Sequence, residues 1–444
     1  MRWSSTGGES ETSDVMPSYF ARKKAYHLTP AWKSLKAWCI RITRRVLIAV
    51  VSLQVLTATI LLLVAALRRY HRDKTDFPRR RFNDVQVEEN SLRLYCYGRE
   101  LYDDMLAAID DAKESIYLES YIWKADDAGW EFKRHLERKA EEGVNVYVIF
   151  DGFGNLVVPR SFKSFHPKIH VLEYQVFKHI GHVFDLRRYS LDHRKLLIVD
   201  GHISFIGGYN IGSLYATSWR DTHLRIVGPA SADLAHSFIN IWNRFCSKKD
   251  SDSITSYYPC RFDPFVILHG NDAMHLTFPI RDMYIEAINR AGHHIYLTNA
   301  YFVPDHVLLG ALKDAAQRGV DVRIMVPLES NHILTDWVSH SYYTECLEAG
   351  IRLLRYRPAM HHAKTCTIDG QWSTIGTANL DRLSSIGNYE LNIEIYSSEF
   401  AQQMELLFAC DATDVAELTL AAWRNRSWVI KFSEKLLAPY RFVM

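Results

Sequence analysis

The sequence predicts an α/β body of two homologous lobes, each a mixed or parallel sheet flanked by helices, preceded by an N-terminal transmembrane helix. Three observations support this fold class. They are an uncharged apolar run at 46–67, a repeat whose copies lie 179 positions apart, and a polar motif that occurs twice. The 444 residues are 48% hydrophobic and 13% aromatic, which excludes collagen-like and disordered classes and allows two or three domains.

The formal charge of +2 hides two regions of opposite sign. Residues 15–82 hold 15 Lys and Arg against two Asp, whereas residues 83–444 hold 37 basic against 46 acidic side chains. An acidic body argues against a general nucleic-acid binder, which needs a broad basic surface for phosphate contacts. We therefore divide the chain into a disordered and basic segment 1–45, a transmembrane helix 46–67, a basic linker 68–88 and two lobes at 89–270 and 271–444.

The run from Val46 to Leu67 contains 22 residues without a charge. As a helix it would extend ~33 Å, enough to cross the hydrocarbon core of a bilayer. Arginines flank it closely on both sides, at 44–45 and 68–69, which favours a single membrane anchor over a buried core helix. The basic residues are nearly equal in number on the two flanks, so the positive-inside rule does not assign an orientation.

The two lobes repeat the same pattern of apolar and turn residues. Ala108, Ile109, Ala112 and the triplet 116–118 recur with identical spacing as Ala287, Ile288, Ala291 and the triplet 295–297. In each copy an amphipathic helix follows and ends at a glycine, Gly143 or Gly319, the usual C-terminal stop. The segments 144–150 and 320–326 then have the β-branched and aromatic content of strands. Strand–helix–strand order predicts right-handed crossovers within each lobe.

Each lobe contains the pattern His-x-Lys-x4-Asp, and residues i and i+2 of a strand face the same side. Seven residues after each Asp comes Gly-small-x-Asn, and an acid follows eleven residues after the Asn. A neutral imidazole can attack phosphorus, a second can protonate the leaving oxygen, and a carboxylate can orient each ring. The candidate residues are His193, Lys195, Asp200, Asn210 and Asp221 in the first lobe, and His362, Lys364, Asp369, Asn379 and Glu390 in the second.

Lys195 and Lys364, with the amides of Asn210 and Asn379, are expected to hold the phosphoryl oxygens. This set is sufficient for phosphoryl transfer without a metal or cofactor, and none is predicted. The seven cysteines are scattered without a Cys-x-x-Cys pair, which disfavours a structural zinc site or a disulfide framework. His361 lies beside His362, but neighbouring strand residues face opposite sides, which argues against a shared metal ion.

These motifs resemble the phospholipase D superfamily, and within it the bacterial cardiolipin synthases, over about 89–444. The matching stretches include IYLESYIWKADDAG, DHRKLLIVDGHISFIGGYNIG, WRDTHLRIVGPA, HHAKTCTIDG and GTANLD. The resemblance implies two phospholipase D-like lobes whose motifs meet at one site, with no cofactor. It implies that one histidine, taken as His193, forms a phosphatidyl-histidine while His362 acts as acid and then base. It also implies that Asp221 and Glu390 orient the two rings, and that Asp200 and Asp369 have a structural role.

The resemblance predicts a transphosphatidylase that makes cardiolipin and glycerol from two phosphatidylglycerol molecules, on a body at the cytoplasmic face of the cell membrane. A hydrolase with the same intermediate, acting on phospholipid or less plausibly on nucleic acid, stays open, as does a catalytically silent membrane scaffold. Neither the acceptor alcohol nor the oligomeric state follows from the sequence. Three further residues have open roles. Glu119 either reaches substrate or is an ordinary strand residue, while Trp219 and Arg220 either contact a headgroup or form a packed Trp with a solvated Arg.

Overall fold

The computed structural model describes residues 30–71, 76–175, 190–246, 253–255, 258–259, 262–428 and 431. The chain separates into two compact units, Met1–Leu67 and Arg68–Met444. Of the predicted disordered and basic segment 1–45, residues 1–29 lie outside the described residues, and residues 30–45 are helical.

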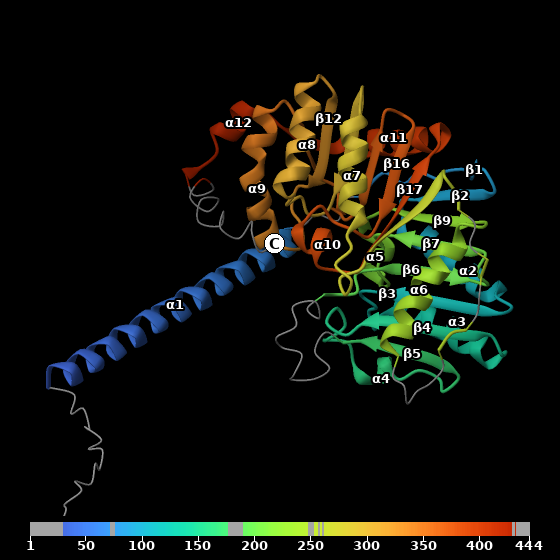
Figure 1. Cartoon of the computed structure of the whole chain (residues 1–444), viewed down its shortest axis with the longest axis horizontal. Coiled ribbons are helices and arrows are strands. Elements are labelled where there is room, and N and C mark those ends of the chain that lie inside the picture. Colours follow the sequence, from blue (N-terminus) through green and yellow to red (C-terminus); the bar gives the residue numbers. More distant parts are fainter. Residues whose placement is uncertain are drawn as a thin grey trace, which may run out of the picture. The chain divides into compact units, whose positions relative to one another are not determined.

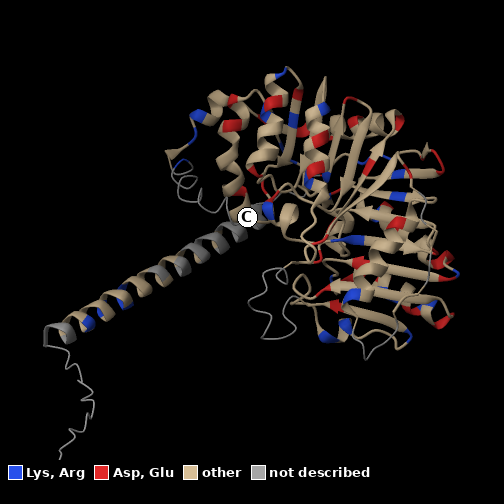
Figure 2. Ribbon diagram, viewed as in Figure 1, with Lys and Arg blue, Asp and Glu red and all other residues tan. Residues whose placement is uncertain are grey.

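The helix α1 (Pro30–His71) contains the predicted membrane span at 46–67. Its first half carries described basic side chains at Lys36, Arg41, Arg44 and Arg45 (Figure 2). Several side chains of the apolar run lie outside the described ones. Among the residues that are described, no helix combines the length and the apolar character that crossing a membrane requires.

The first lobe is built on an eight-stranded mixed sheet, with order β1-β2-β9-β7-β6-β3-β4-β5 (Figure 1). Its last three strands are parallel and the others antiparallel. The strands are β1 (Val85–Val87), β2 (Asn90–Tyr95), β3 (Ser115–Ser120), β4 (Asn145–Asp151), β5 (Ile169–Tyr174), β6 (Lys195–Val199), β7 (Ile203–Gly207) and β9 (His223–Val227).

The second lobe has an equivalent sheet, with order β10-β17-β16-β15-β11-β12-β13-β18. β11, β12 and β13 are parallel, like their counterparts β3, β4 and β5. β10 pairs along its whole length with β17, so the predicted boundary between residues 270 and 271 falls within this strand. The strands are β10 (Val266–Asn271), β11 (His294–Asn299), β12 (Asp321–Pro327), β13 (Arg352–Tyr356), β15 (Lys364–Ile368), β16 (Trp372–Gly376), β17 (Glu390–Tyr396) and β18 (Val415–Leu418).

Helices join and cover the strands of each lobe. α3 and α8 begin at equivalent aspartates, Asp126 and Asp305, whose carboxylates accept backbone N–H groups of the first turn. Just beyond these helices Gly143 and Gly319 adopt φ of +97° and +94°, as the repeat predicts. The helices of the body are α2 (Gly98–Asp111), α3 (Asp127–Glu141), α4 (Arg160–Lys163), α5 (Ser213–Thr217), α6 (Ser231–Phe245), α7 (Pro279–Arg290), α8 (His306–Gln317), α9 (Ile333–Glu348), α10 (Arg382–Ile386), α11 (Ser398–Asp411), the 3₁₀ turn η3 (Ala412–Asp414) and α12 (Leu420–Arg424).

The two lobes share a hydrophobic core. Leu234 and Phe238 of α6 belong to the same buried cluster as Phe400 and Met404 of α11 and Ile393 of β17. Backbone pairing also crosses between the lobes, because β8 (Trp219–Arg220) of the first lobe forms a parallel pair with β14 (Met360–His361) of the second. The lobes therefore form a single packed body rather than two independent domains.

Gly143, which follows α3, and Gly310, which lies inside α8, give a test of the positive φ at the end of the helix. Gly143→Ala is expected to lower stability by about 1 kcal/mol, because the positive φ at this position disfavours a residue with a Cβ. No described atom lies within 4 Å of the added Cβ, so a steric clash does not contribute. Gly310→Ala, inside α8 and equally free of neighbours, is expected to raise stability by up to ~1 kcal/mol. Thermal unfolding of the full chain measures both. A shift of the same sign in the two variants would contradict this interpretation.

Candidate active site

The two motif histidines lie where backbone hydrogen bonds cross between the lobes. The N–H of His193 donates to the carbonyl of Tyr389 at 3.1 Å, and the N–H of His362 donates to the carbonyl of Arg220 at 2.7 Å. Each acceptor directly precedes the acidic residue of its own lobe. The pairing therefore brings each histidine beside the acid of the opposite lobe.

The side chains complete these pairs. His193 Nδ1 lies 3.0 Å from Glu390 Oε2, and His362 Nδ1 lies 2.6 Å from Asp221 Oδ2. Both carboxylates are fully buried. Thr377 Oγ1 donates to Glu390 in addition, at 2.5 Å. A carboxylate on Nδ1 selects the tautomer in which Nδ1 carries hydrogen, so Nε2 of each ring keeps its lone pair for chemistry.

Burial favours the neutral form of both histidine rings. Burial lowers the pKa of His193 and of His362 well below the usual range, and the charges of Lys195 and Lys364 lower it further. Burial also raises the pKa of Glu390 to about 8 and shifts the pKa of Asp221 upward. A neutral imidazole is the form that attacks phosphorus.

Lys195 and Lys364 lie next to the histidines, at the starts of β6 and β15. Each Nζ donates to the carbonyl of its own motif histidine, and Lys364 Nζ also lies 3.0 Å from His362 Nδ1. Burial lowers the pKa of Lys195 to about 7 and that of Lys364 to about 8. An anion entering the site would offset the burial and favour the charged ammonium form.

A cavity of about 270 Å³ opens between the histidines. Asn210 and Asn379 line it together with His193 and His362, and the buried Asn379 Oδ1 atom has no hydrogen-bond partner among the described residues. Thus four of the ten predicted residues line the cavity. Asp221 and Glu390 contact the histidines but do not line it, and neither do the two lysines. The wall consists of Tyr121, Ile122, Leu191, His193, Asn210, Tyr215, Trp219, Tyr301, Val303, Asn331, His332, Thr335, His362, Asn379, Asp381, Leu383, Ser384 and Asn388.

Asp200 and Asp369 lie away from this cavity. Both occupy positive φ, near +50°, in the turns that follow β6 and β15. Asp200 accepts backbone N–H groups of 113–115, each at 2.8 Å, and Asp369 accepts those of 292–294 at 2.7–2.9 Å. Their carboxylates hold the loops that enter β3 and β11, which corresponds to the structural role that the resemblance implies.

Aromatic side chains in the cavity wall were not among the predicted site residues. The rings of Tyr121 and His193 are centred 4.7 Å apart, and those of Trp219 and His362 are 5.2 Å apart. Tyr301 lies between His332 and His362, with ring centres 5.4 and 6.1 Å away. For Trp219 the signal was its position two residues before Asp221. Tyr121 lies within the matching stretch IYLESYIWKADDAG, and Tyr301 belongs to the aromatic content, whereas no repeat or motif marks His332.

Glu119 and Arg220 have structural partners. Glu119 is buried and forms an ion pair with Arg194, which also bonds Asp192 at 3.1 Å. Arg220 is fully buried, so neither a solvated side chain nor a headgroup contact describes it. It forms an ion pair with Asp411 at 2.7 Å.

Comparison with known proteins identifies the family. The family model described as "Cardiolipin synthase, PLD-like domain" matches residues 105–242 and 284–411, one match in each lobe. The chain belongs to this family. A cardiolipin synthase of Listeria monocytogenes serotype 4a (strain HCC23) is 36% identical over 372 residues, covering 80% of this chain and 76% of the relative. A cardiolipin synthase of Staphylococcus aureus (strain N315) is 33% identical over 369 residues, covering 79% and 74%.

Solved structures share the family's fold. The phosphatidylserine synthase of Haemophilus influenzae Rd KW20 aligns with a TM-score of 0.59 at 16% identity, over 82% of this chain and 95% of that one. A polyphosphate kinase from Porphyromonas gingivalis aligns with a TM-score of 0.51 at 13% identity, over 80% and 53%. At these identities the likeness concerns the arrangement of the two lobes.

The amide contacts of Asp369 give a pH-dependent test of its role. Burial alone would raise its pKa, but the backbone N–H groups of 292–294 outweigh this and lower it. Asp369→Ala is therefore expected to lower stability at pH 7 by about 2 kcal/mol. The difference from wild type should shrink as pH falls below about 4, through the lowered pKa, because the carboxylate is then lost in both states.

Asp282→Ala is the control for Asp369, since this exposed carboxylate makes a single long contact at 3.5 Å to Arg281. Thermal unfolding between pH 3 and pH 7 is the measurement. A stability loss in Asp369→Ala that stays constant over this range would rule out the carboxylate as its cause.

Proposed function

We propose that the chain is a membrane-anchored cardiolipin synthase. It transfers the phosphatidyl group of one phosphatidylglycerol to a hydroxyl of a second and releases glycerol. The observation that carries the proposal is the crossed pair of histidine–carboxylate contacts, His193 with Glu390 and His362 with Asp221, on one cavity. The cardiolipin synthases among its relatives support this substrate class.

In the first step the Nε2 lone pair of His193 attacks phosphorus. A P–N bond forms and the P–O bond to the glycerol headgroup breaks, while His362 gives the proton on its Nε2 to the departing oxygen. Glu390 stabilises the positive charge that forms on the His193 ring, and Asp221 together with the phosphodiester charge favours the protonated form of His362. Lys195 and Lys364 offset the negative charge of the phosphoryl oxygens.

In the second step a hydroxyl of another phosphatidylglycerol gives its proton to His362 Nε2 and attacks phosphorus. The P–N bond breaks, His193 returns to its neutral form, and the products are cardiolipin and glycerol. Water in place of this hydroxyl would yield phosphatidic acid instead. The aromatic wall formed by Tyr121, Tyr215 and Trp219 supports the selection of a lipid alcohol, because it limits the polar surface that water would occupy.

The membrane anchor is part of the proposal. Residues 46–67 carry no charged side chain and are flanked by arginines, which suits a bilayer span that holds the site beside its lipid substrate. We propose that the body faces the cytoplasm, the orientation that the family resemblance implies.

The product of the purified full chain tests the function. With phosphatidylglycerol in mixed detergent micelles, wild type is expected to form cardiolipin and glycerol, detected by mass spectrometry. His193→Ala and His362→Ala should each reduce the rate by at least about 10³-fold. His275→Ala, a largely exposed histidine paired with Asp272, should leave the rate unchanged. Phosphatidic acid as the sole product would reassign the chain as a hydrolase.

Rapid acid-free quenching tests the assignment of the nucleophile. Wild type mixed with phosphatidylglycerol labelled at phosphorus is expected to carry the label on the peptide that contains His193. The phosphoramidate bond is stable enough in alkali for peptide mapping. Label on the peptide with His362 would exchange the two roles, and absence of label at every time point would argue against a covalent intermediate.

A further inference from the structure

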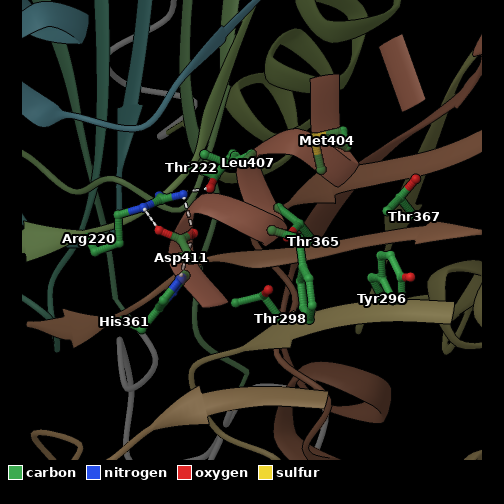
Figure 3. Close-up of a pocket in the computed structure, with 11 residues that line it drawn as sticks. Arg220, Thr222, Tyr296, Thr298, His361, Thr365, Thr367, Met404, Leu407 and Asp411 are labelled. Carbon is green, nitrogen blue, oxygen red and sulfur yellow. Dashed lines mark hydrogen bonds and ion pairs between the residues drawn. The ribbon is translucent and has the colours of Figure 1, made fainter. Parts of the chain in front are cut away.

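Arg220, His361 and Asp411 form a buried ion cluster (Figure 3). Arg220 and His361 directly precede Asp221 and His362 in the chain. Arg220 Nε and Nη2 bond the two oxygens of Asp411 at 3.0 and 2.7 Å. His361 Nε2 bonds the same carboxylate at 3.2 Å. The adjoining cavity has a volume of only about 10 Å³, so the cluster has no room for a substrate.

The cluster is bonded directly to the backbone of the catalytic pair. Arg220 Nη1 donates to the carbonyl of Asp221 and, at 3.2 Å, to Thr222 Oγ1. The carbonyl of Arg220 in turn accepts the N–H of His362 at 2.7 Å. Asp411 is thus linked through a single arginine to both members of the pair.

The cluster also joins the two lobes. Arg220 belongs to β8 of the first lobe, whereas His361 belongs to β14 and Asp411 ends α11 in the second. Residues Arg220 and His361 are register partners in the β8–β14 pair. The side-chain contacts through Asp411 therefore restrain the same crossing that places His362 opposite Asp221.

The other catalytic pair has a different environment. Tyr389 precedes Glu390 as Arg220 precedes Asp221, so an uncharged phenol replaces the guanidinium. Asp192 precedes His193 as His361 precedes His362, and it bonds Arg194 at 3.1 Å within its own lobe. The duplicated fold thus supports its two histidines by unlike means.

We propose that Asp411 is a positioning residue for the His362–Asp221 pair, acting through Arg220 and His361. This inference rests on the proposed function, in which His362 transfers the proton to and from the alcohol oxygen. Loss of the Asp411 contacts would misplace His362 relative to that oxygen while leaving the attack of His193 on phosphorus intact. Small displacements of a proton donor are sufficient to slow its transfer about 10–100-fold.

Two substrates separate these steps. Phosphatidylglycerol releases glycerol, whose oxygen needs a proton, whereas phosphatidyl-p-nitrophenol releases a phenolate that is stable without one. Under single-turnover conditions, Asp411→Asn is expected to slow glycerol release by about 10–100-fold and p-nitrophenolate release by less than about twofold. A general loss of structure would slow both releases alike.

Asp414→Asn is the matched control, because Asp414 forms an exposed ion pair with Arg357 at 2.7 Å near the same helix end. It should leave both releases unchanged. If Asp411→Asn does not unfold cooperatively, and so is not properly folded, a second pair of variants replaces it. His361→Phe and His361→Gln both keep the Arg220–Asp411 ion pair. Phenylalanine removes the N–H donor and should slow glycerol release selectively, whereas glutamine restores the donor and should recover it.

The possible outcomes distinguish failure of the positioning role from failure of the proposed cardiolipin synthase function. Wild type that forms no cardiolipin would refute the proposed function. The positioning role alone would be overturned by a different result. In that case wild type forms cardiolipin, but Asp411→Asn and His361→Phe either release both leaving groups at the wild-type rate or slow both releases equally. Selective slowing of glycerol release in either folded variant would establish it.

Discussion

The structure depends on one exchange of backbone hydrogen bonds between the lobes. The N–H of each motif histidine bonds the carbonyl that precedes the acid of the opposite lobe, at His193–Tyr389 and His362–Arg220. Since side chains alternate along extended backbone, this pairing decides which residue faces the cavity. A shift by one residue would turn each histidine away from its carboxylate. Neither lobe alone contains a complete histidine–acid pair.

Close packing around the acids makes this exchange possible. A Cβ on Gly208 would lie 2.0 Å from an Asp221 oxygen, so only glycine lets that carboxylate occupy its place. The equivalent residue of the second lobe is Thr377, which contacts Glu390 by donating a hydrogen bond instead. In the first lobe a glycine leaves room for the acid, and in the second a threonine hydroxyl donates a hydrogen bond to it. The two lobes therefore share the backbone arrangement but differ in the side chain that contacts the acid.

The duplicated motifs made much of this site predictable, because equal spacing in two copies identifies residues that share one geometry. That spacing identifies the two histidines, their lysines, the asparagines and both acids. The sequence could not place Arg220, which was expected to be solvated or to contact a headgroup. Its partner Asp411 lies 191 positions away in another lobe and belongs to no motif. The sequence could not place Tyr121 and Tyr301 beside the motif histidines either, since the neighbours of these rings are set by tertiary packing.

Burial explains how an acidic body can accommodate a phosphodiester. Desolvation lowers the pKa of Lys195 to about 7 and raises that of Glu390 to about 8, which favours the neutral form of both groups. An arriving anion offsets this effect for the lysine, because it stabilises the ammonium form, and it likewise stabilises the imidazolium form of His362. Charge therefore develops in the site together with substrate binding. The net charge of the body is then no obstacle, since the ionisable groups around the cavity respond locally to a bound phosphate.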